Sequence, residues 1–217
     1  DRRCALADER GGLPRPLVFD VQNKGATRAA IAGRPAAWQQ VDLLVNNAGL
    51  ALGLEPAHKA ELEDWEQMIA TNISGLTLVT RLLLPGMVAR GYGKVLNVAS
   101  TAAFQHGPHM AGYFASKAYV LSLSEALAYE LKDSGVTVTA LCPGPTQTEF
   151  IERAGMKESL LFTLGKSSAK KVAQAGYQAM LRGEATVIPG LHNWALAQTV
   201  RFTPRKVVRS LASMLVK

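Results

Sequence analysis

An α/β fold with a doubly wound parallel sheet is the architecture that these 217 residues predict. Short apolar runs rich in β-branched residues alternate with longer segments of helical period, which is typical of βαβ units around a parallel sheet. Small or polar residues also follow the expected strands, where the carboxyl ends of parallel strands face one crevice. The expected strands are Leu17–Phe19, Leu43–Val45, Val95–Val98, Val136–Leu141 and Thr186–Ile188. The expected helices are Thr27–Gln40, Glu61–Arg90 and Tyr113–Lys132.

Local signals mark where these elements begin and end. In the three helical segments the apolar residues recur three and four apart, and polar residues fill the opposite face. Pro85 interrupts the second helix and predicts a kink or a terminal turn there. Turns at Gly91–Gly93 and at Ser134-Gly135 lead into the next two strands. The least periodic stretch, residues 146–170, is expected to be a mobile, lid-like excursion.

The composition is that of a soluble globular protein, with 48% apolar and 19% charged residues, and the length favours one domain over residues 1–217. No long uncharged apolar run and no leader pattern is seen, so neither a membrane span nor a signal peptide is expected. The two cysteines, Cys4 and Cys142, are too few for a disulfide framework and lack the C-x-x-C spacing of a zinc site. A cytoplasmic location is therefore expected.

The basic excess is confined to the last third of the chain. Residues 1–150 carry 13 Lys/Arg and 14 Asp/Glu, whereas residues 151–217 carry 11 and 3. The C-terminal segment 192–217 is basic and amphipathic, and three interpretations stay open: a solvated helix face, weak contact with a membrane surface, or a nucleic-acid patch. The solvated face is favoured. No zinc-finger spacing or RNP aromatic pattern supports nucleic-acid binding.

Tyr113 and Lys117 carry the first chemical signal. They are four apart at the start of a helix, so the ammonium can approach the phenol and stabilise phenolate. Alone this spacing is weak, since a surface Tyr packed along a Lys stem looks the same. Ser100 stands 13 residues before Tyr113, at the end of an expected strand. Two hydroxyl donors at one crevice are what a carbonyl oxygen needs as it becomes an alkoxide.

A wider set of motifs resembles the short-chain dehydrogenase/reductase family over nearly the whole chain. The motifs are Asn46-Asn47-Ala48-Gly49, Asn72, Ser100, Tyr113-x-x-x-Lys117 and Pro143-Gly144. The resemblance implies a Rossmann-like fold, a homo-oligomer and hydride transfer between a secondary alcohol and a carbonyl. It implies NADP(H) as cofactor, with NAD as the alternative, because Arg2 and Arg3 outnumber Asp1 where the 2′-phosphate would lie.

The resemblance also assigns roles to residues. It implies that Ser100 and Tyr113 hold the substrate oxygen, that Lys117 lowers the Tyr113 pKa and holds the ribose, and that Asn72 anchors a water. The implied catalytic residues are thus Asn72, Ser100, Tyr113 and Lys117. The implied cofactor-binding residues are Arg2, Arg3, Asp20, Val21, Asn47, Ala48, Gly49, Tyr113, Lys117, Pro143, Gly144, Thr146 and Thr148. Phe104, His106, His109 and Met110 are expected to line the substrate pocket near Ser100.

The sequence departs from the family pattern at its start. The glycine-rich T-G-x-x-x-G-x-G loop is absent, and Asp1 aligns with the end of the second family strand. An N-terminal βαβ unit of roughly 30 residues or more is therefore expected to be missing. The alternative is a non-catalytic member or fragment without a working dinucleotide site. Leu50–Trp65 resembles the 3-hydroxy-acid and serine dehydrogenases, whereas Val136–Lys217 resembles the broad-specificity ketoreductases, which we weight more for substrate.

Overall fold

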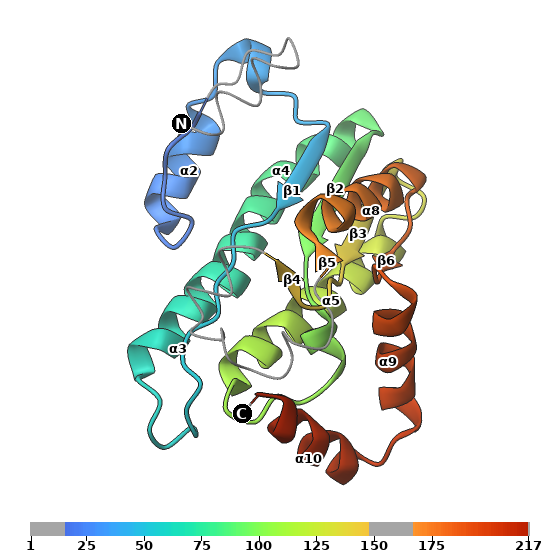
Figure 1. Ribbon diagram of the computed structural model, residues 1–217. Helices are drawn as coiled ribbons and strands as arrows, with labels where there is room; N and C mark the ends of the chain where they lie inside the picture. Colours follow the sequence, from blue (N-terminus) through green and yellow to red (C-terminus); the bar gives the residue numbers. More distant parts are fainter. Residues whose placement is uncertain (1–15, 148–166, 217) are drawn as a thin grey trace.

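Four parallel strands form the main sheet of the computed structural model, which describes residues 16–147 and 167–216 (Figure 1). They lie in the order β1-β2-β3-β6, and each neighbouring pair is parallel. Their bounds are β1 Leu43–Asn46, β2 Gly93–Val98, β3 Val136–Leu141 and β6 Thr186–Val187. Four of the five predicted strands are confirmed, and their ends shift by two residues at most.

Helices cover both faces of this sheet (Figure 1). Because side chains alternate along a strand, Val95 of β2 packs with Met87 of α4, whereas the next residue, Leu96, packs with Met180 of α8. The α-helices are α2 Lys24–Ala32, α3 Leu62–Met68, α4 Leu76–Arg90, α5 Ala111–Glu130, α8 Ala169–Arg182, α9 Leu191–Phe202 and α10 Arg205–Val216. With α4 and α5 on one face and α8 on the other, the doubly wound arrangement is confirmed.

The predicted strand Leu17–Phe19 is wrong. The segment has no regular secondary structure, and the Val18 side chain is 93% exposed. A strand needs a neighbour for its backbone hydrogen bonds, and none pairs with this segment in the described part of the chain. The helix predicted over Thr27–Gln40 begins earlier and ends at Ala32, because Pro35 follows and only the short 3₁₀ helix η1 (Ala36–Trp38) forms beyond it.

The predicted helix Glu61–Arg90 is observed as a continuous run, α3–η2–α4, in which η2 (Ile69–Gly75) is a wider π-helical turn. The helix continues through Pro85 to Arg90, so a terminal turn at Pro85 is wrong, while the kink that was the other expectation stays a prediction. By length and composition alone, this run could cross a membrane. Its packing against the sheet and α5 explains the apolar character equally well, since Met68, Leu76 and Met87 are buried in the core.

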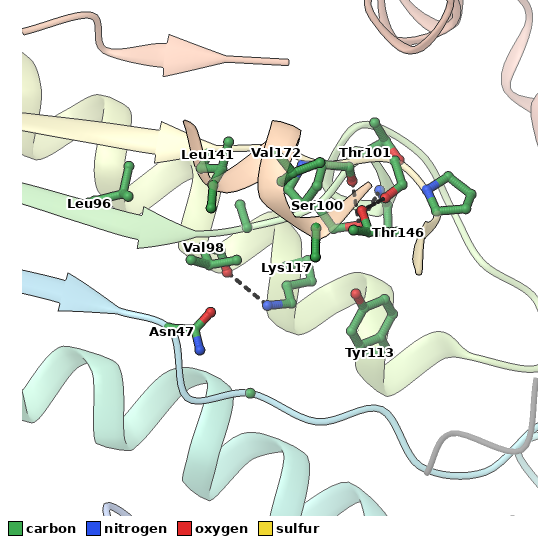
Figure 2. Close-up of a pocket in the computed structure, with 18 of the residues that line it drawn as sticks. Asn47, Leu96, Val98, Ser100, Thr101, Tyr113, Lys117, Leu141, Thr146 and Val172 are labelled. Atoms are coloured by element: carbon green, nitrogen blue, oxygen red, sulfur yellow. Dashed lines mark hydrogen bonds between the residues drawn. The ribbon is translucent and has the colours of Figure 1, made fainter. Parts of the chain in front are cut away.

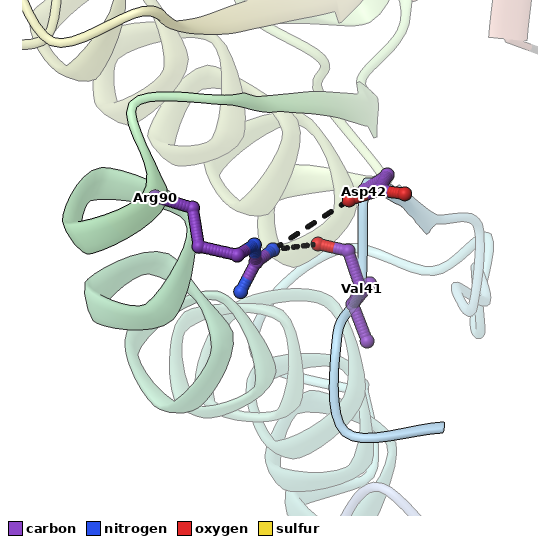
Figure 3. A network of polar contacts seen from close by, with 3 residues as sticks. All are labelled: Val41, Asp42 and Arg90. Atoms are coloured by element: carbon purple, nitrogen blue, oxygen red, sulfur yellow. Dashed lines mark hydrogen bonds and ion pairs between the residues drawn. The ribbon is translucent and has the colours of Figure 1, made fainter. Parts of the chain in front are cut away.

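The end of α4 is tied to the start of β1 (Figure 3). Arg90 donates a hydrogen bond to the carbonyl oxygen of Val41 at 2.8 Å and lies 3.7 Å from the Asp42 carboxylate. Gly91 then ends the helix in the left-handed region, with φ at 66°, and turns the chain into β2. These contacts fix β1 beside β2 at the end opposite the crevice.

A ladder of buried polar side chains crosses the sheet. The Asn46 amide donates to Thr80 Oγ1 at 2.9 Å and to Asn97 Oδ1 at 2.8 Å. The Asn97 amide in turn donates to Ser124 Oγ at 2.9 Å. The ladder thereby joins α4, β1, β2 and α5, and each buried amide has a partner, as burial requires.

The excursion expected over residues 146–170 is described only at its ends. Thr146–Gln147 (β4) and Ser167–Ser168 (β5) pair as a short parallel ladder. Residues 148–166 lie outside the described residues, so a mobile lid stays a prediction. At its far end the excursion leads directly into α8, whose first residue is Ala169.

Candidate active site

A cavity of about 540 Å³ opens at the carboxyl ends of β1, β2 and β3 (Figure 2). The loop after β1 supplies Asn47 and Gly49, the loop after β2 supplies Ser100 and Thr101, and the loop after β3 supplies Pro143–Thr146. Apolar side chains of β2, α5 and α8 make up most of the remaining wall. The structure thus brings three of the predicted strand-end loops to one crevice.

Ser100 stands where β2 gives way to the short 3₁₀ helix η3 (Thr101–Phe104). It is the N-cap of that helix, since its Oγ accepts a hydrogen bond from the backbone N–H of Ala102 at 3.1 Å. The hydroxyl also donates to the carbonyl oxygen of Pro143 across 3.5 Å, which is long for an O–H···O bond. The cap therefore fixes the Ser100 oxygen at the cavity wall.

Tyr113 lies in the first turn of α5 and is buried against the cavity. Burial raises the pKa of its phenol to about 12, and a hydrogen bond with the Ser100 side chain acts in the opposite direction. The cost of burying a phenolate sets the net direction of this pKa shift, and the lowering effect of Lys117 stays a prediction. At neutral pH the Tyr113 hydroxyl is protonated.

Lys117 follows one turn later on α5 and is only 6% exposed. Its Nζ donates a hydrogen bond to the carbonyl oxygen of Val98, the last residue of β2, at 2.8 Å. The same Nζ lies 5.8 Å from the centroid of the Tyr113 ring. Burial lowers the pKa of Lys117 to about 8. Figure 2 shows Ser100, Tyr113 and Lys117 gathered in one corner of the cavity.

Asn72 lies in the π-helical turn η2, behind this corner. Its amide oxygen accepts from the backbone N–H of Leu50, and its amide nitrogen donates to the Leu50 carbonyl and to Ser116 Oγ, each at 2.9 Å. A Cβ on Gly49 would lie 3.4 Å from both Asn72 Oδ1 and Lys117 Nζ. Asn72 therefore holds the loop after β1 against α5, beside the lysine, and does not itself line the cavity.

The predicted cofactor set is only partly gathered at the cavity. The members that line it are Asn47, Gly49, Tyr113, Lys117, Pro143, Gly144 and Thr146. Ala48 does not line it. Asp20 and Val21 are also absent from its wall, because the strand that should bring them there does not form. Instead, Asp20 accepts from the backbone N–H of Gln22 at 2.9 Å, and Val21 packs on Gly75. Arg2, Arg3 and Thr148 lie outside the described residues.

The expected substrate-pocket residues separate into different places. Met110 lines the cavity, but Phe104 packs into a core cluster with Leu76 and Val120. His109, with φ at 68°, lines a second cavity of about 290 Å³, which shares Met110 with the first. His106 is exposed and lines neither cavity. The loop before α5 thus sends only one of the four side chains toward Ser100.

Sequence reasoning missed the contribution of α8 and α9. From α8, Val172, Tyr177 and Met180 line the cavity, and from α9 the Asn193 side chain lies against Gly144, so closely that a Cβ on Gly144 would collide with it. The signal for α8 is present in the sequence: apolar residues recur at helical spacing before Gly183, which ends the helix at φ 72°.

Comparisons with known proteins agree with this geometry. The sequence model of a protein family described as "short chain dehydrogenase" matches residues 5–159. An NADP-dependent 3-hydroxy acid dehydrogenase of Salmonella typhi is 48% identical over 146 residues, which are 66% of this chain and 58% of the relative. The chain thus spans less than two thirds of the length of the curated relatives it matches.

Solved structures of serine dehydrogenases are also similar to this chain. The crystal structure of serine dehydrogenase from Escherichia coli is 48% identical, with a TM-score of 0.57 over 58% of this chain and 59% of that one. A closed form of serine dehydrogenase complexed with NADP+ is 36% identical, with a TM-score of 0.74 over 86% of this chain and 79% of that one. From its motifs, its sheet and these matches, the chain belongs to the short-chain dehydrogenase family.

Proposed function

We propose that this protein is an NADP(H)-dependent oxidoreductase that interconverts a secondary alcohol and a carbonyl by hydride transfer, with Tyr113 as general acid and base. The observation that carries the proposal is the corner of the cavity where Ser100, Tyr113 and Lys117 meet, next to the ends of three parallel strands. The cofactor is supported by relatives named as NADP-dependent and by a similar structure complexed with NADP+.

The residues around this corner fit the nicotinamide and ribose end of a dinucleotide. Gly49 presents bare backbone toward Asn72 and Lys117, which leaves room for a sugar to approach the lysine. Across the cavity, Gly144 and Thr146 present a backbone and a hydroxyl group on the loop after β3. Lys117 and Asn47 would hold the ribose and its neighbouring amide through hydrogen bonds, as polar groups in a mainly apolar cavity.

The chain's own residues supply positioning and proton transfer. When bound, the nicotinamide donates a hydride to the carbonyl carbon, or accepts one from the carbinol carbon. In reduction the Tyr113 hydroxyl donates its proton to the substrate oxygen as negative charge develops there, and Ser100 Oγ–H donates a hydrogen bond to the same oxygen. The Lys117 ammonium beside the ring then stabilises the phenolate that remains. Oxidation follows the reverse course, with phenolate as the base.

Two substrate classes follow from two sets of observations. The matched relatives include 3-hydroxy acid and serine dehydrogenases, whose substrates carry a carboxylate. The cavity wall is mainly apolar, and among the described residues that line it only Lys117 is a cation. We therefore propose an uncharged ketone and its secondary alcohol as the better substrates, in line with the resemblance of Val136–Lys217 to the ketoreductases.

The experiment that tests the function follows the absorbance of NADPH or NADH during incubation of the protein with matched uncharged ketones and 3-oxo acids. Turnover that prefers NADPH and the uncharged ketones supports the proposal in full. Faster turnover of the 3-oxo acids overturns the substrate class and leaves the reaction standing. Absence of turnover, together with failure to bind either nucleotide in calorimetry, contradicts the proposal and favours a non-catalytic member of the family.

A further inference from the structure

The turn between α9 and α10 is an exposed cluster of aromatic and basic residues. Residues 201–206, here called the α9–α10 corner, read Arg-Phe-Thr-Pro-Arg-Lys. Phe202 is 87% exposed, and Arg201, Arg205 and Lys206 around it are exposed as well. A single exposed ring is normal on a protein surface, whereas a contiguous apolar patch rimmed by polar residues marks an interaction site.

The outer face of α9 continues this cluster. Leu191, Trp194 and Phe202 recur at spacings of three and eight, which place them along one side of the helix. Leu191 and Trp194 are 81% and 50% exposed. Arg201 follows Trp194 by seven residues, two helical turns, so it lies on the same side. One face of α9 thus combines an aliphatic, two aromatic and one cationic side chain.

Two residues of α9 hold the helix against the rest of the molecule, although most of its side chains are exposed. Ala197 is buried, and the Asn193 side chain lies against Gly144 in the loop after β3. The Asn193 amide also donates to the carbonyl oxygen of Pro189 at 2.8 Å. In Figure 1, α9 and α10 lie at the margin of the molecule, on the far side of the sheet from α2. Leu191, Trp194 and Phe202 are therefore exposed on a helix that Ala197 and Asn193 hold in place.

The charge of residues 185–217 indicates which kind of partner this surface binds. The sequence has no Asp or Glu from residue 185 to residue 217, while it has five Lys or Arg there. Protein–protein interfaces are enriched in Arg, Trp and Phe but depleted in Lys, whereas an anionic membrane surface attracts every cation and takes up Trp and Phe at the boundary of headgroups and acyl chains. Amphipathic helices with this composition lie in the plane of the membrane surface.

We propose that the α9–α10 corner docks this protein on membranes that contain anionic phospholipids. Phe202 and Trp194 enter the boundary between headgroups and acyl chains, and Arg201, Arg205 and Lys206 contact the lipid phosphates. This surface is separate from the cavity, so the inference goes beyond the proposed oxidoreductase function and does not rest on it.

Vesicle binding tests the proposal with the full chain. The probes are phosphatidylcholine vesicles with and without phosphatidylglycerol, and binding is measured by cosedimentation at low and at high salt. We expect binding only to the phosphatidylglycerol vesicles, weakened by salt because the contact is electrostatic. Trp194 reports its own insertion: tryptophan emission should shift to the blue on binding, and Trp194→Phe should remove that shift.

Two variants at the corner separate its charge from its apolar contact. Because each cation near an anionic surface contributes roughly fivefold in affinity, the triple variant R201Q/R205Q/K206Q should bind about 100-fold more weakly. Phe202→Ser should weaken binding by about tenfold at unchanged charge. The matched control, K24Q/R28Q/K132Q, removes three exposed cations elsewhere and should lose much less affinity.

The vesicle-binding results either support or overturn docking on lipid. Weaker vesicle binding by both corner variants, with the control close to wild type, supports docking on lipid. No vesicle binding by the wild-type chain overturns it, as does equal loss in the corner and control variants. Self-association that Phe202→Ser abolishes, in a chain that ignores vesicles, also overturns it and assigns the corner to a second copy.

Discussion

Tyr113 and Lys117 share one buried corner, and burial shifts both of their pKa values toward the neutral form. The pKa of the Tyr113 phenol is raised to about 12, and the pKa of the Lys117 ammonium is lowered to about 8. Both shifts have desolvation as the main cause, since each side chain would have to hold its charge away from water. At neutral pH the phenol is therefore protonated and the lysine is a cation, which is the pair of states that carbonyl reduction needs at its start.

Replacing Lys117 by Met should change how stability depends on pH. The folded pKa lies below the usual 10.5, so between about pH 8 and pH 10.5 the unfolded chain binds a proton that the folded chain lacks. The contribution of Lys117 to the free energy of unfolding should therefore rise with pH in this window, by about 3 kcal/mol, whereas buried Cys142, with its pKa raised from 9.0 to about 12, acts with the opposite sign above pH 9 in both proteins. Below pH 8 both states are protonated, and the folded chain carries the full cost of the buried ammonium.

Urea unfolding at several pH values measures this effect. The Lys117→Met variant should lack the rise between pH 8 and pH 10, although other groups titrate identically in both proteins. Above pH 10 the buried Tyr113 acts with the opposite sign, because its raised pKa keeps the folded phenol neutral while the unfolded one ionises. Equal pH profiles for variant and wild type would show that Lys117 is not buried as a cation.

At the residue level, the sequence could predict which side chains share the crevice, but it could not predict the direction of their pKa shifts. The spacing of Ser100, Tyr113 and Lys117 predicted that they share a crevice, and the structure places them at one cavity. The direction of the Tyr113 shift depends on how deeply α5 and the loop after β2 bury the ring. No local pattern encodes that burial, because residues distant in sequence contribute to it.

Among the elements, the long helix α3–η2–α4 shows how a local irregularity positions a side chain. The π-helical turn Ile69–Gly75 widens the helix at Asn72, which reaches both the Leu50 backbone and Ser116. Such single wide turns inside α-helices often occur at functional sites. Here the turn connects the loop after β1 with α5, next to Lys117.

The polar ladder makes a second prediction at this scale. Asn97→Ala leaves Asn46 with one partner instead of two and removes the donor to Ser124. Since these groups are buried, we expect a loss of roughly 2 to 4 kcal/mol in the free energy of unfolding, measured in urea. The control Gln178→Ala, at an exposed position of α8, should change stability by less than about 0.5 kcal/mol. A loss below about 1 kcal/mol for Asn97→Ala would mean that the ladder is dispensable.

The elements themselves were predictable where their pattern was periodic and their partners were present. β3 was predicted at its observed bounds, Val136–Leu141, because six β-branched or apolar residues follow a clear turn. The segment Leu17–Phe19 has a similar pattern but forms no strand, since strand formation depends on a neighbour as much as on propensity. Helix α2 ended early at Ala32 because Pro35 outweighed the continuing apolar spacing.

Across the whole molecule, stability should be graded from the middle of the sheet to its edges. β2 pairs with β1 over four residues and with β3 over six, whereas β6 pairs with β3 only at Thr186 and Val187. Amide hydrogen exchange should therefore be slowest in β2 and in the part of β3 beside it, and much faster in β6, which opens locally. Exchange in β6 as slow as in β2 would contradict this gradient.

Strand β1 is partly exposed at one edge of the described sheet. Leu43 and Val45 of β1 are 42% and 51% exposed, although the strand pattern predicts burial on both faces of a parallel sheet. In the described part of the chain β1 pairs with β2 alone. The exposure of β1 fits the expectation from the sequence that an N-terminal βαβ unit is missing, which leaves a strand of the sheet without a neighbour.

Replacing Tyr113 by Phe, with Tyr119→Phe as the matched control, is the sharpest test of the proposed reaction. Tyr119 lies on the same helix, is 37% exposed and shares a 3.0 Å hydrogen bond with Thr77. If Tyr113 transfers the proton, Tyr113→Phe should lower kcat for NADPH-dependent carbonyl reduction by roughly 10² to 10⁴-fold, with the Kd for NADPH nearly unchanged. The control should keep its kcat. A Tyr113→Phe variant that reduces the carbonyl at the wild-type rate would show that the proton comes from elsewhere.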